Sequence, residues 1–549
     1  MSDRRRWALA TGVTGAMVAA VRWWTSRGRD EYAIWPDEPA QLAIARFIGG
    51  GTRWNMDDHS VWRPLFGTLL APAHWFTDDP VTVLHVAFGL NAVLGGVAAA
   101  LLVFLARRLT PLDPWWAAGA ATVVSLAPAT IFTTEFVFAE SLVAPLFLAT
   151  LLALLRLHGA PTLTGGVIAA GLAAAAFGAH SRMLPLGLLV VAVVVLAAVR
   201  QRISSRDASI VVAAAMTATL AVEAYTRWIV GRLWDEPSTR NSPAGVIEQL
   251  GSGPAVLVSL IGQSWYLVVA SVGVVVYGLA VLVGRSRDRD QSGGDARVVL
   301  AAVGACFALS VVFMADRWRS DQLVYGRYND AVVTPVLLLG VAVVLGALPM
   351  RRLLVVAVAT AGGTVVGGVV LWALRRDTLA DSNGLEPMIL GLQPFATSPT
   401  AIDVVRISVW AAAVTIALAL VAQWPGAARR VVVSASLAAL VALGWVRTSS
   451  IVDRSWDDSG DISAVEMLGD GILGGVATVD FYLPEGNTGT NRMMLYQFYL
   501  PHTEFSVVHG PDDATSTLVF AHLDAEGFAE PPARLVWTDP KGRYGLFRR

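Results

Sequence analysis

Lysine and cysteine are almost absent from this chain of 549 residues. Lysine occurs once, at Lys541, so arginine supplies the other basic side chains. The single cysteine, Cys306, excludes an intramolecular disulfide, and its place inside an apolar run is typical of a packing residue. Any part of the chain outside the cell must therefore be stabilised by its core alone.

Charge is scarce as well. Charged residues make up 15% of the chain, whereas 55% of the residues are hydrophobic and the mean hydropathy is +0.57. This composition excludes an ordinary soluble protein. A net charge of -1 without a basic arm argues against a nucleic-acid partner, and the histidines show no zinc-site spacing. The sequence predicts a mainly α, polytopic membrane protein.

Apolar runs long enough to cross a bilayer recur about thirteen times along the chain. We place the predicted spans near residues 7–24, 83–105, 115–133, 138–156, 163–179, 183–199, 209–231, 261–284, 298–315, 331–349, 353–374, 402–424 and 431–447.

Arginine clusters set the predicted orientation, because arginine accumulates in short loops on the cytoplasmic side. The clusters precede the first span or follow alternate later ones, at Arg4–Arg6, Arg107–Arg108, Arg200–Arg206, Arg285–Arg289, Arg351–Arg352 and Arg429–Arg430. We therefore expect a multi-pass protein of the cell membrane with a cytoplasmic N-terminus. An odd number of spans places the C-terminal segment outside.

The C-terminal segment differs from the rest in composition. Residues 448–549 contain 15 Asp and Glu against 7 Lys and Arg. We predict a membrane domain over residues 1–447 and a small extracytoplasmic α/β domain over 448–549, with a helix near 491–500 and strands near 477–483, 503–509, 516–522 and 533–537. Its clustered aromatics favour packing over sugar binding, and they are Tyr482, Tyr496, Phe498 and Tyr499.

Two adjacent acids, Asp37 and Glu38, lie just beyond the first predicted span. Pro36 and Pro39 bracket them, which predicts a stiff turn into a short helix that begins near Pro39. The apolar side of this helix suits a position on the membrane surface. The acids fit a solvated helix start and a functional pair equally well.

Three further external places carry charge close to the hydrocarbon, which is costly unless the charge is paired or used. Glu140 follows Glu135 in a very short turn and fits either a helix cap or a buried second acid. Arg182 is wedged between two apolar stretches, so it must snorkel, pair with an acid or bind an anion. The loop at 316–330 is dense in guanidinium, phenol and carboxylate groups, which suit a phosphate or internal salt bridges.

The first external loop continues with Asp57, Asp58, His59 and Arg63. Oxygen ligands suit Mg²⁺ and Mn²⁺, so a divalent cation at the external carboxylates is an open alternative that the spacing does not require. We assign no residue as a metal ligand.

The order of these motifs resembles the polyprenyl-phosphate-dependent glycosyltransferases of the GT-C fold, nearest to the protein mannosyltransferase and aminoarabinose transferase group. The resemblance covers roughly the first 350 residues. It rests on Asp37-Glu38 with Ala43-Ile44-Ala45-Arg46, Arg63-Pro64-Leu65 through Pro72, Phe138-Ala139-Glu140-Ser141-Leu142, Ser181-Arg182, and Arg327-Tyr328 ahead of Pro335. Arg63-Pro64-Leu65 departs from the family's usual Pro-Pro.

The resemblance implies an inverting sugar transfer from a polyprenyl-phosphate monosaccharide at the external membrane face. Asp37 would be the base, Glu38 its support and Glu140 the second acid. The lipid phosphate would be held by Arg182, Arg327 and Tyr325, and acceptor or sugar contacts would come from Asp58, His59, Arg63 and Arg319. Decaprenyl-phosphate mannose or arabinose would be natural donors, and a cell-wall glycan, a lipid or a protein would be the acceptor.

A secondary transporter or flippase is the main alternative, because it too would be polytopic and charged near the membrane. It would need charges deep within spans and usually an internal repeat. The best candidates are Glu223 and Arg227, one helical turn apart, and these suit a pair with each other. A non-catalytic scaffold would explain the spans but not the concentration of acids and arginines beside them.

Overall fold

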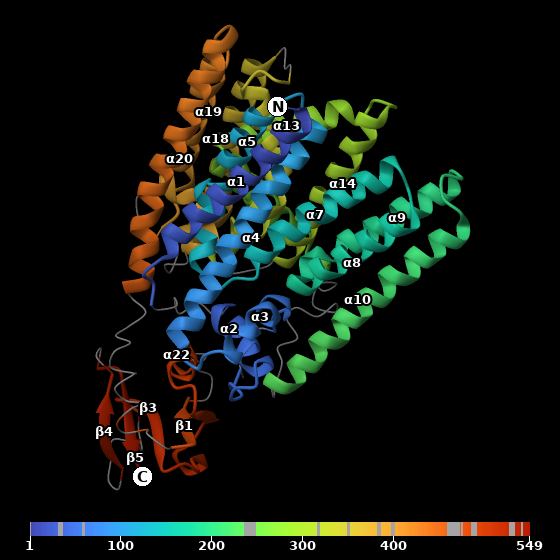
Figure 1. Cartoon of the computed structure of the whole chain (residues 1–549). Helices are drawn as coiled ribbons and strands as arrows, with labels where there is room; N and C mark the ends of the chain where they lie inside the picture. Colours follow the sequence, from blue (N-terminus) through green and yellow to red (C-terminus); the bar gives the residue numbers. More distant parts are fainter. Residues whose placement is uncertain are drawn as a thin grey trace.

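Apolar helices form most of the computed structural model, and a small sheet follows them at the C-terminus (Figure 1). The structure describes residues 2–30, 37–56, 61–234, 249–315, 319–348, 352–380, 386–396, 401–457, 471, 473, 476–484, 491–525, 533–539 and 542–549. The statements below refer to these residues.

The long helices run along the bundle. They are α1 (Asp3–Ser26), α4 (Pro80–Leu109), α5 (Pro114–Ser125), α7 (Glu140–Gly159), α8 (Leu163–Ala179), α9 (Leu184–Val199), α10 (Ser205–Leu233), α12 (Gly253–Ala270), α13 (Val274–Arg285), α14 (Gln291–Phe313), α17 (Thr334–Val344), α18 (Leu353–Ala380), α19 (Val404–Val421) and α20 (Gly426–Asp457).

Short helices and 3₁₀ turns connect the long helices. They are α2 (Asp37–Ile48), α3 (Leu65–Leu70), η1 (Ala71–Trp75), α6 (Pro128–Ile131), η2 (Phe132–Glu135), η3 (Ser181–Met183), α15 (Ser320–Leu323), α16 (Arg327–Val332) and η5 (Glu386–Phe395). Figure 1 shows α2 and α3 at the end of the bundle that faces the sheet. The predicted loop at 316–330 is wrong for residues 320–323 and 327–330, which are helical and largely buried.

The helix ends follow local capping chemistry. Asp79 accepts from the Thr82 N–H at 2.8 Å, and Asp113, Ser204, Asp290 and Asp403 cap their helices in the same way. Such caps satisfy donors that the hydrocarbon region cannot.

Close packing of small residues joins the first two long helices. A Cβ added to Gly96 would lie 2.5 Å from the carbonyl oxygen of Gly15, so α1 and α4 approach at backbone distance. Arg22 crosses Gly95 in the same interface and donates to the Ser125 carbonyl at 3.1 Å. The interface therefore ties α1 to the end of α5.

The prediction of a multi-pass membrane protein is confirmed, because nine described helices are long and apolar enough to cross a membrane, or ten if the pair around α16 and α17, bent by 75°, is one span. Two predicted spans are broken. The run at 261–284 divides between α12 and α13, where Gly273 has a φ of +78°, and the run at 115–133 divides after Ser125. The figure of thirteen spans stays a prediction.

The C-terminal sheet is mixed. Its strands are β1 (Thr478–Tyr482), β2 (Glu504–Val508), β3 (Leu518–His522), β4 (Arg534–Thr538) and β5 (Tyr544–Arg548), in the order β2-β1-β3-β5-β4. β1 pairs in parallel with β2 and β3, whereas β5 pairs antiparallel with β3 and β4. Helix α22 (Asn491–Tyr499) links β1 to β2.

The predicted α/β character is confirmed, with the helix and four strands close to the expected positions and β5 in addition. Buried Tyr496 stacks on Phe520 at a ring-centroid distance of 4.6 Å, as the packing interpretation predicts. The boundary at 447/448 stays a prediction, and α20 runs past it to Asp457.

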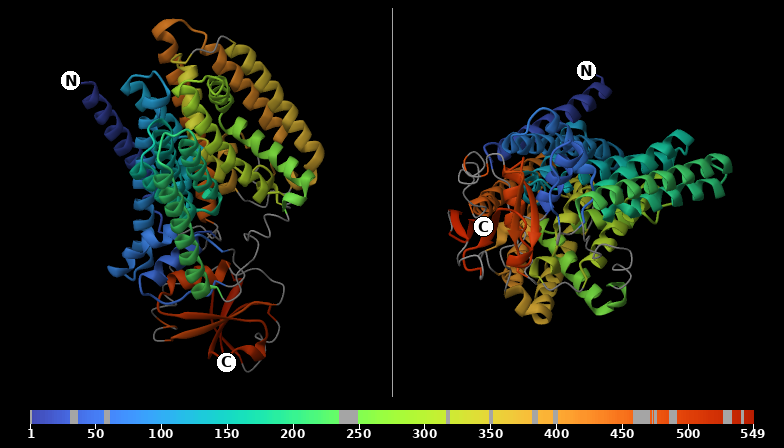
Figure 2. Two further views of the ribbon diagram at one scale, coloured as in Figure 1. Left: turned by 90° about the vertical axis from the view of Figure 1, so that its right-hand side faces the viewer. Right: turned by 90° about the horizontal axis from the view of Figure 1, so that it is seen from below.

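The two termini lie at opposite ends of the molecule. The N-terminus is at the end of the bundle away from the sheet, in both Figure 1 and the left view of Figure 2. The short helices α2, α3 and α22 lie between the bundle and the sheet (Figure 1). This arrangement suits termini on opposite sides of a membrane, and which side each occupies stays a prediction.

Candidate functional site

The acidic pair opens α2. Asp37 and Glu38 occupy its first turn, so the helix begins slightly before the predicted Pro39. Every residue from Asp37 to Arg46 is buried in the protein. Helices α3 and α22 pack against α2, so its apolar side contacts protein, and its position at the membrane surface stays a prediction.

The C-terminal domain holds the far end of α2. Arg46 donates from one guanidinium nitrogen to the Gln497 carbonyl at 2.6 Å and from another to the Phe498 carbonyl at 2.9 Å. Both carbonyls belong to the last turn of α22, where a cation is favoured. The Gln497 side chain also bonds both ways with the Asn55 backbone. The helix that carries the acids is thus fastened to the C-terminal domain.

Arg327 joins two of the predicted acids. Its Nε donates to Glu140 Oε1 at 2.7 Å, and a terminal nitrogen pairs with Asp37 Oδ2. The three groups come from α16, α7 and α2, far apart in sequence. Two carboxylates share one guanidinium, so this acid–arginine cluster carries a formal charge of one minus.

Apolar and soft groups surround the cluster. The remaining terminal nitrogen of Arg327 lies 3.2 Å from the sulfur of Met388, and its guanidinium carbon lies 4.2 Å from the centre of the Phe138 ring. The Tyr325 hydroxyl lies 3.3 Å from the same sulfur. The guanidinium is thus shielded from water, which strengthens its attraction to both acids.

Glu38 lies behind Asp37 and is fully buried. Its Oε1 accepts the Val137 N–H at 2.9 Å, while Oε2 has no hydrogen-bond partner among the described residues. Burial raises the pKa of the Glu38 carboxyl well above its ordinary value, against the lowering effect of the Val137 bond. This environment favours a neutral carboxylic acid next to Asp37.

Arg182 forms a second cationic centre in η3. Its guanidinium carbon lies 3.3 Å from the ring centre of Tyr328 and 5.8 Å from that of Tyr325. Its Nε and one terminal nitrogen are buried without a hydrogen-bond partner in the described part of the chain. A buried cation with free donors and no salt bridge among the described residues is suited to bind an anion.

The rings around Arg182 are themselves stacked. Tyr325 and Tyr328 lie 4.6 Å apart, and the His180 ring lies 4.5 Å from Tyr328. Burial, and then the charge of Arg182, hold the pKa of His180 well below its ordinary value. The imidazole is therefore neutral, and its Nδ1 accepts the Arg182 N–H at 3.2 Å.

Other predicted site residues are paired with neighbouring charges, and their predicted contacts with acceptor or sugar stay a prediction. Arg63 pairs with Glu223 at 2.8 Å, and Arg319 pairs with Asp321 at 3.1 Å. Glu135, the alternative second acid, pairs with Arg29 at 3.0 Å. Glu140 is thus the acid that shares Arg327 with Asp37. Asp58 and His59 lie outside the described residues.

Glu223 and Arg227 pair with each other at 3.1 Å, as the alternative to a transport role predicts. Arg63 pairs with the same carboxylate, so this group at the surface of α10 has two guanidiniums for one acid.

The structure does not test the predicted divalent cation. Within the described residues, no three His, Cys, Asp or Glu side chains gather as a metal site would require, and Asp57 and Asp58 are not among those residues. The guanidinium of Arg327 already takes the place of a cation between Asp37 and Glu140.

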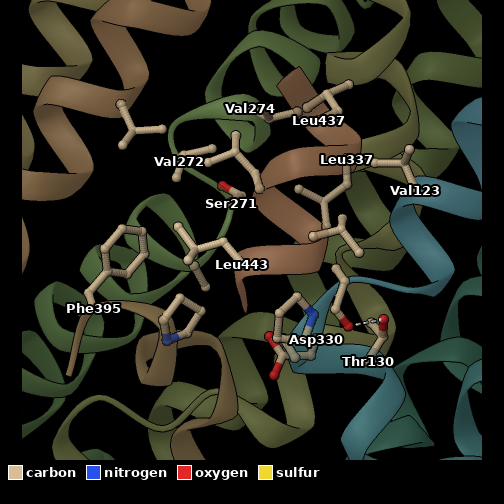
Figure 3. A pocket seen from close by; sticks show the side chains of 18 of the residues that line it. Val123, Thr130, Ser271, Val272, Val274, Asp330, Leu337, Phe395, Leu437 and Leu443 are labelled. Atoms are coloured by element: carbon tan, nitrogen blue, oxygen red, sulfur yellow. Dashed lines mark hydrogen bonds between the residues drawn. The ribbon is translucent and has the colours of Figure 1, made fainter. Parts of the chain in front are cut away.

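A cavity of about 450 Å³ lies beside the acid–arginine cluster. Figure 3 shows its apolar lining, including Val274, Leu337 and Leu437, with Asp330 and Thr130 together at one end. Asp330 lies on α16, one turn beyond Arg327, and accepts from the Tyr266 hydroxyl at 2.9 Å. The cavity is thus separated from the cluster by α16.

The sequence did not predict two contacts of the site. Met388 touches both Arg327 and Tyr325, yet an isolated methionine carries no signal of such a role. The ring of Tyr328 covers Arg182. Its position next to Arg327 in the sequence was the one signal that could have indicated this contact. The assembled site offers a proton acceptor, a neutral acid and an anion-binding cation within one buried region.

Comparison with known proteins supports the fold alone. No protein-family model matches the chain, and no curated protein sequence matches it. The solved structure of ArnT from Cupriavidus metallidurans in the apo state aligns with 15% identity and a TM-score of 0.54, over 97% of both chains. The same protein bound to undecaprenyl phosphate aligns with 14% identity and a TM-score of 0.52, again over 97% of both chains.

The arabinosyltransferase EmbB from Mycobacterium smegmatis is also similar, with 16% identity and a TM-score of 0.44 over 80% of this chain and 41% of that one. The alignment with ArnT over nearly the whole length confirms the GT-C fold that the sequence predicts.

Proposed function

We propose that this protein is a membrane glycosyltransferase that moves a sugar from a polyprenyl-phosphate monosaccharide to an extracytoplasmic acceptor. The observation that carries the proposal is the acid–arginine cluster, in which Asp37 and Glu140 share Arg327 next to the open donors of Arg182. The GT-C fold supports it, and the ArnT structure holds undecaprenyl phosphate.

Asp37 would act as the base. As the acceptor hydroxyl oxygen forms its bond to the anomeric carbon, the hydroxyl proton passes to Asp37. The bond from the anomeric carbon to the phosphate oxygen breaks, and its electron pair stays on the polyprenyl phosphate. A single displacement of this kind inverts the anomeric configuration.

The charge of the cluster favours this proton transfer. Two carboxylates and one guanidinium leave one excess negative charge, which uptake of a proton by Asp37 removes. Glu140 would keep Arg327 in place afterwards and contact the acceptor or sugar. Glu38, held neutral by burial, would support Asp37 as a hydrogen-bond donor through its open carboxyl oxygen.

Arg182 would hold the phosphate of the donor. Its Nε and terminal nitrogen have no partner to give up within the described residues, whereas Arg327 is already shared by two acids. Tyr325 and Tyr328 would orient Arg182 through their rings. Offsetting the charge that develops on the leaving phosphate lowers the barrier. In this proposal Arg182 binds the donor phosphate, and Arg327 pairs with the two acids.

The cavity of about 450 Å³ would hold part of the hydrocarbon chain of the donor, since it is apolar and lies among the spanning helices (Figure 3). Replacing Leu337 with Trp should fill it. We expect a higher KM for long-chain donors and an unchanged KM for short-chain analogues. Leu188→Trp on the exposed face of α9 is the control. An equal effect on both donor classes would place the chain elsewhere.

The reaction class is tested in proteoliposomes with a panel of polyprenyl-phosphate sugars that includes mannose and arabinose. We expect transfer from one member, with inverted configuration at the anomeric carbon of the product. Movement of intact donor across the bilayer without cleavage would instead establish a flippase. A requirement for Mg²⁺ or Mn²⁺ at the external carboxylates, which the sequence leaves open, is tested by chelation and readdition of each metal.

A further inference from the structure

A second cavity, of about 270 Å³, lies at the other end of the bundle. Helices α7, α9 and α14 each have one end beside the functional site, at Glu140, next to Arg182 and at Phe313 respectively. Their opposite ends, at Gly159, Val199 and Gln291, surround this cavity. The 16 residues of α9 span roughly 24 Å. The arginine end of the cavity is therefore separated from the site by nearly the thickness of the hydrocarbon layer, while its apolar wall extends along α9 as far as Leu189.

The wall of the cavity is apolar on two sides. Leu189, Val193 and Leu196 contribute from α9, and Val298 and Ala301 contribute from α14. Leu196 is half exposed on the surface of the bundle, where lipid tails would cover it. The wall thus forms a crevice for hydrocarbon.

Three arginines line the same cavity at the level where the helices end. They are Arg200, Arg202 and Arg297. None of the three forms a salt bridge within the described part of the chain. Arg202 donates to the carbonyls of His158 and Gly159 at 3.0 and 2.6 Å. These neutral partners fix its position and leave its charge unbalanced.

Arg297 is held in the same manner. It donates to the carbonyls of Ser286 and Asp288 at 2.7 and 3.0 Å. The nearby acid Asp295 forms a salt bridge with Arg108, and each of its two oxygens accepts a hydrogen bond of 2.9 Å from that guanidinium. The positive charge at the cavity is therefore not cancelled by Asp295.

The turn at the end of α9 places two of the arginines beside the cavity. The Arg202 N–H bonds the Ala197 carbonyl at 2.8 Å, and the Gln201 N–H bonds the Ala198 carbonyl at 2.9 Å. This is a Schellman turn with Gln201 in the left-handed region at a φ of 57°. The turn brings the chain back from α9 toward the end of α7.

We propose that this cavity binds one anionic phospholipid from the leaflet opposite the C-terminal domain. Its phosphate would lie among Arg200, Arg202 and Arg297, and one acyl chain would follow the crevice between α9 and α14. Basic pockets between spanning helices bind anionic headgroups, and arginine suits phosphate oxygens. The charge and the apolar wall together specify the occupant, independently of the reaction at the other end.

Native mass spectrometry of the full-length protein tests this proposal, with phosphatidylglycerol and phosphatidylcholine of identical chains as probes. We expect one phosphatidylglycerol retained per protein, and at least fivefold less phosphatidylcholine. The double variant Arg200→Gln, Arg297→Gln should lower phosphatidylglycerol retention at least fivefold. The control Arg5→Gln, Arg352→Gln removes two charges from the same end outside the cavity and should leave retention unchanged.

A second variant, Ala301→Trp, tests the crevice without altering charge. Ala301 is exposed in the cavity wall, so a larger side chain fills the crevice at little cost to the fold. We expect the retained lipid to be lost while the thermal unfolding midpoint stays close to that of the native protein. Equal retention of both probes, or equal loss in the arginine control, would overturn the proposal. Asp37→Asn should not alter retention, which separates this test from that of the proposed function.

Discussion

The acid–arginine cluster around Arg327 and the surface group around Glu223 contain the same chemical groups in opposite proportion. The first has two carboxylates for one guanidinium, with side chains 1–12% exposed. The second has two guanidiniums for one carboxylate, and Arg227 is 80% exposed. Water can balance the surplus charge of the second group but is largely kept from the first. The comparison teaches that burial, and not the pairing itself, decides how strongly an unbalanced charge is felt.

The largest expected effect on stability is at Arg327. Arg327→Gln leaves Asp37 and Glu140 buried without their shared cation, which should cost about 3–5 kcal/mol of unfolding free energy. Arg227→Gln in the exposed group should cost no more than about 1 kcal/mol. Thermal and denaturant unfolding in detergent measures both. Equal losses in the two variants would contradict the distinction between the clusters.

The next effect is on donor binding. Arg182→Gln removes a buried cation whose free donors would contact the phosphate, so donor affinity should fall by about 1.5–3 kcal/mol, or roughly 10- to 150-fold. Arg108→Gln, which removes a cation already paired with Asp295 near the opposite end of the bundle, is the control and should leave the affinity unchanged. Titration with a non-hydrolysable donor measures this difference. An unaltered affinity in Arg182→Gln would move the phosphate to another group.

A smaller effect is expected from pH. Burial raises the pKa of Glu38 in the folded protein, so the folded state holds this proton more tightly than the unfolded chain does. Its contribution to stability is complete below the ordinary carboxyl pKa and is lost as the pH rises toward the folded pKa. Glu38→Gln keeps the acceptor for the Val137 N–H and should remove this loss.

The unfolding midpoints of the native protein and Glu38→Gln should therefore diverge as the pH rises above the ordinary carboxyl value, with the variant more stable. Parallel midpoints across that range would show that Glu38 is not held neutral by the fold.

The sequence predicts much of the secondary structure because hydrophobic periodicity is local. The four strands at 477–537 and the helix at 491–500 follow from short alternating or apolar runs, whereas β5 is a five-residue strand next to a charged turn. The broken span at 261–284 was missed because its break depends on the left-handed backbone at Gly273, inside a continuous apolar run.

The candidate residues could be singled out from the sequence, whereas their arrangement could not, and their functional roles stay a proposal. External charge near hydrocarbon singles out Asp37, Glu140, Arg182 and Arg327 individually. The sharing of Arg327 by two acids joins segments up to 290 residues apart, so only the tertiary fold reveals it. The burial of α2 likewise depends on α22, which the sequence places in a different domain.

The most direct test of the central claim is transfer of radiolabelled sugar in proteoliposomes by the native protein, Asp37→Asn and Asp321→Asn. Asp321 is also a buried aspartate paired with an arginine, but it lies outside the acid–arginine cluster. We predict that transfer disappears in Asp37→Asn with donor binding kept, and persists in Asp321→Asn. Transfer at the native rate by a folded Asp37→Asn protein would contradict the assignment of Asp37 as the base.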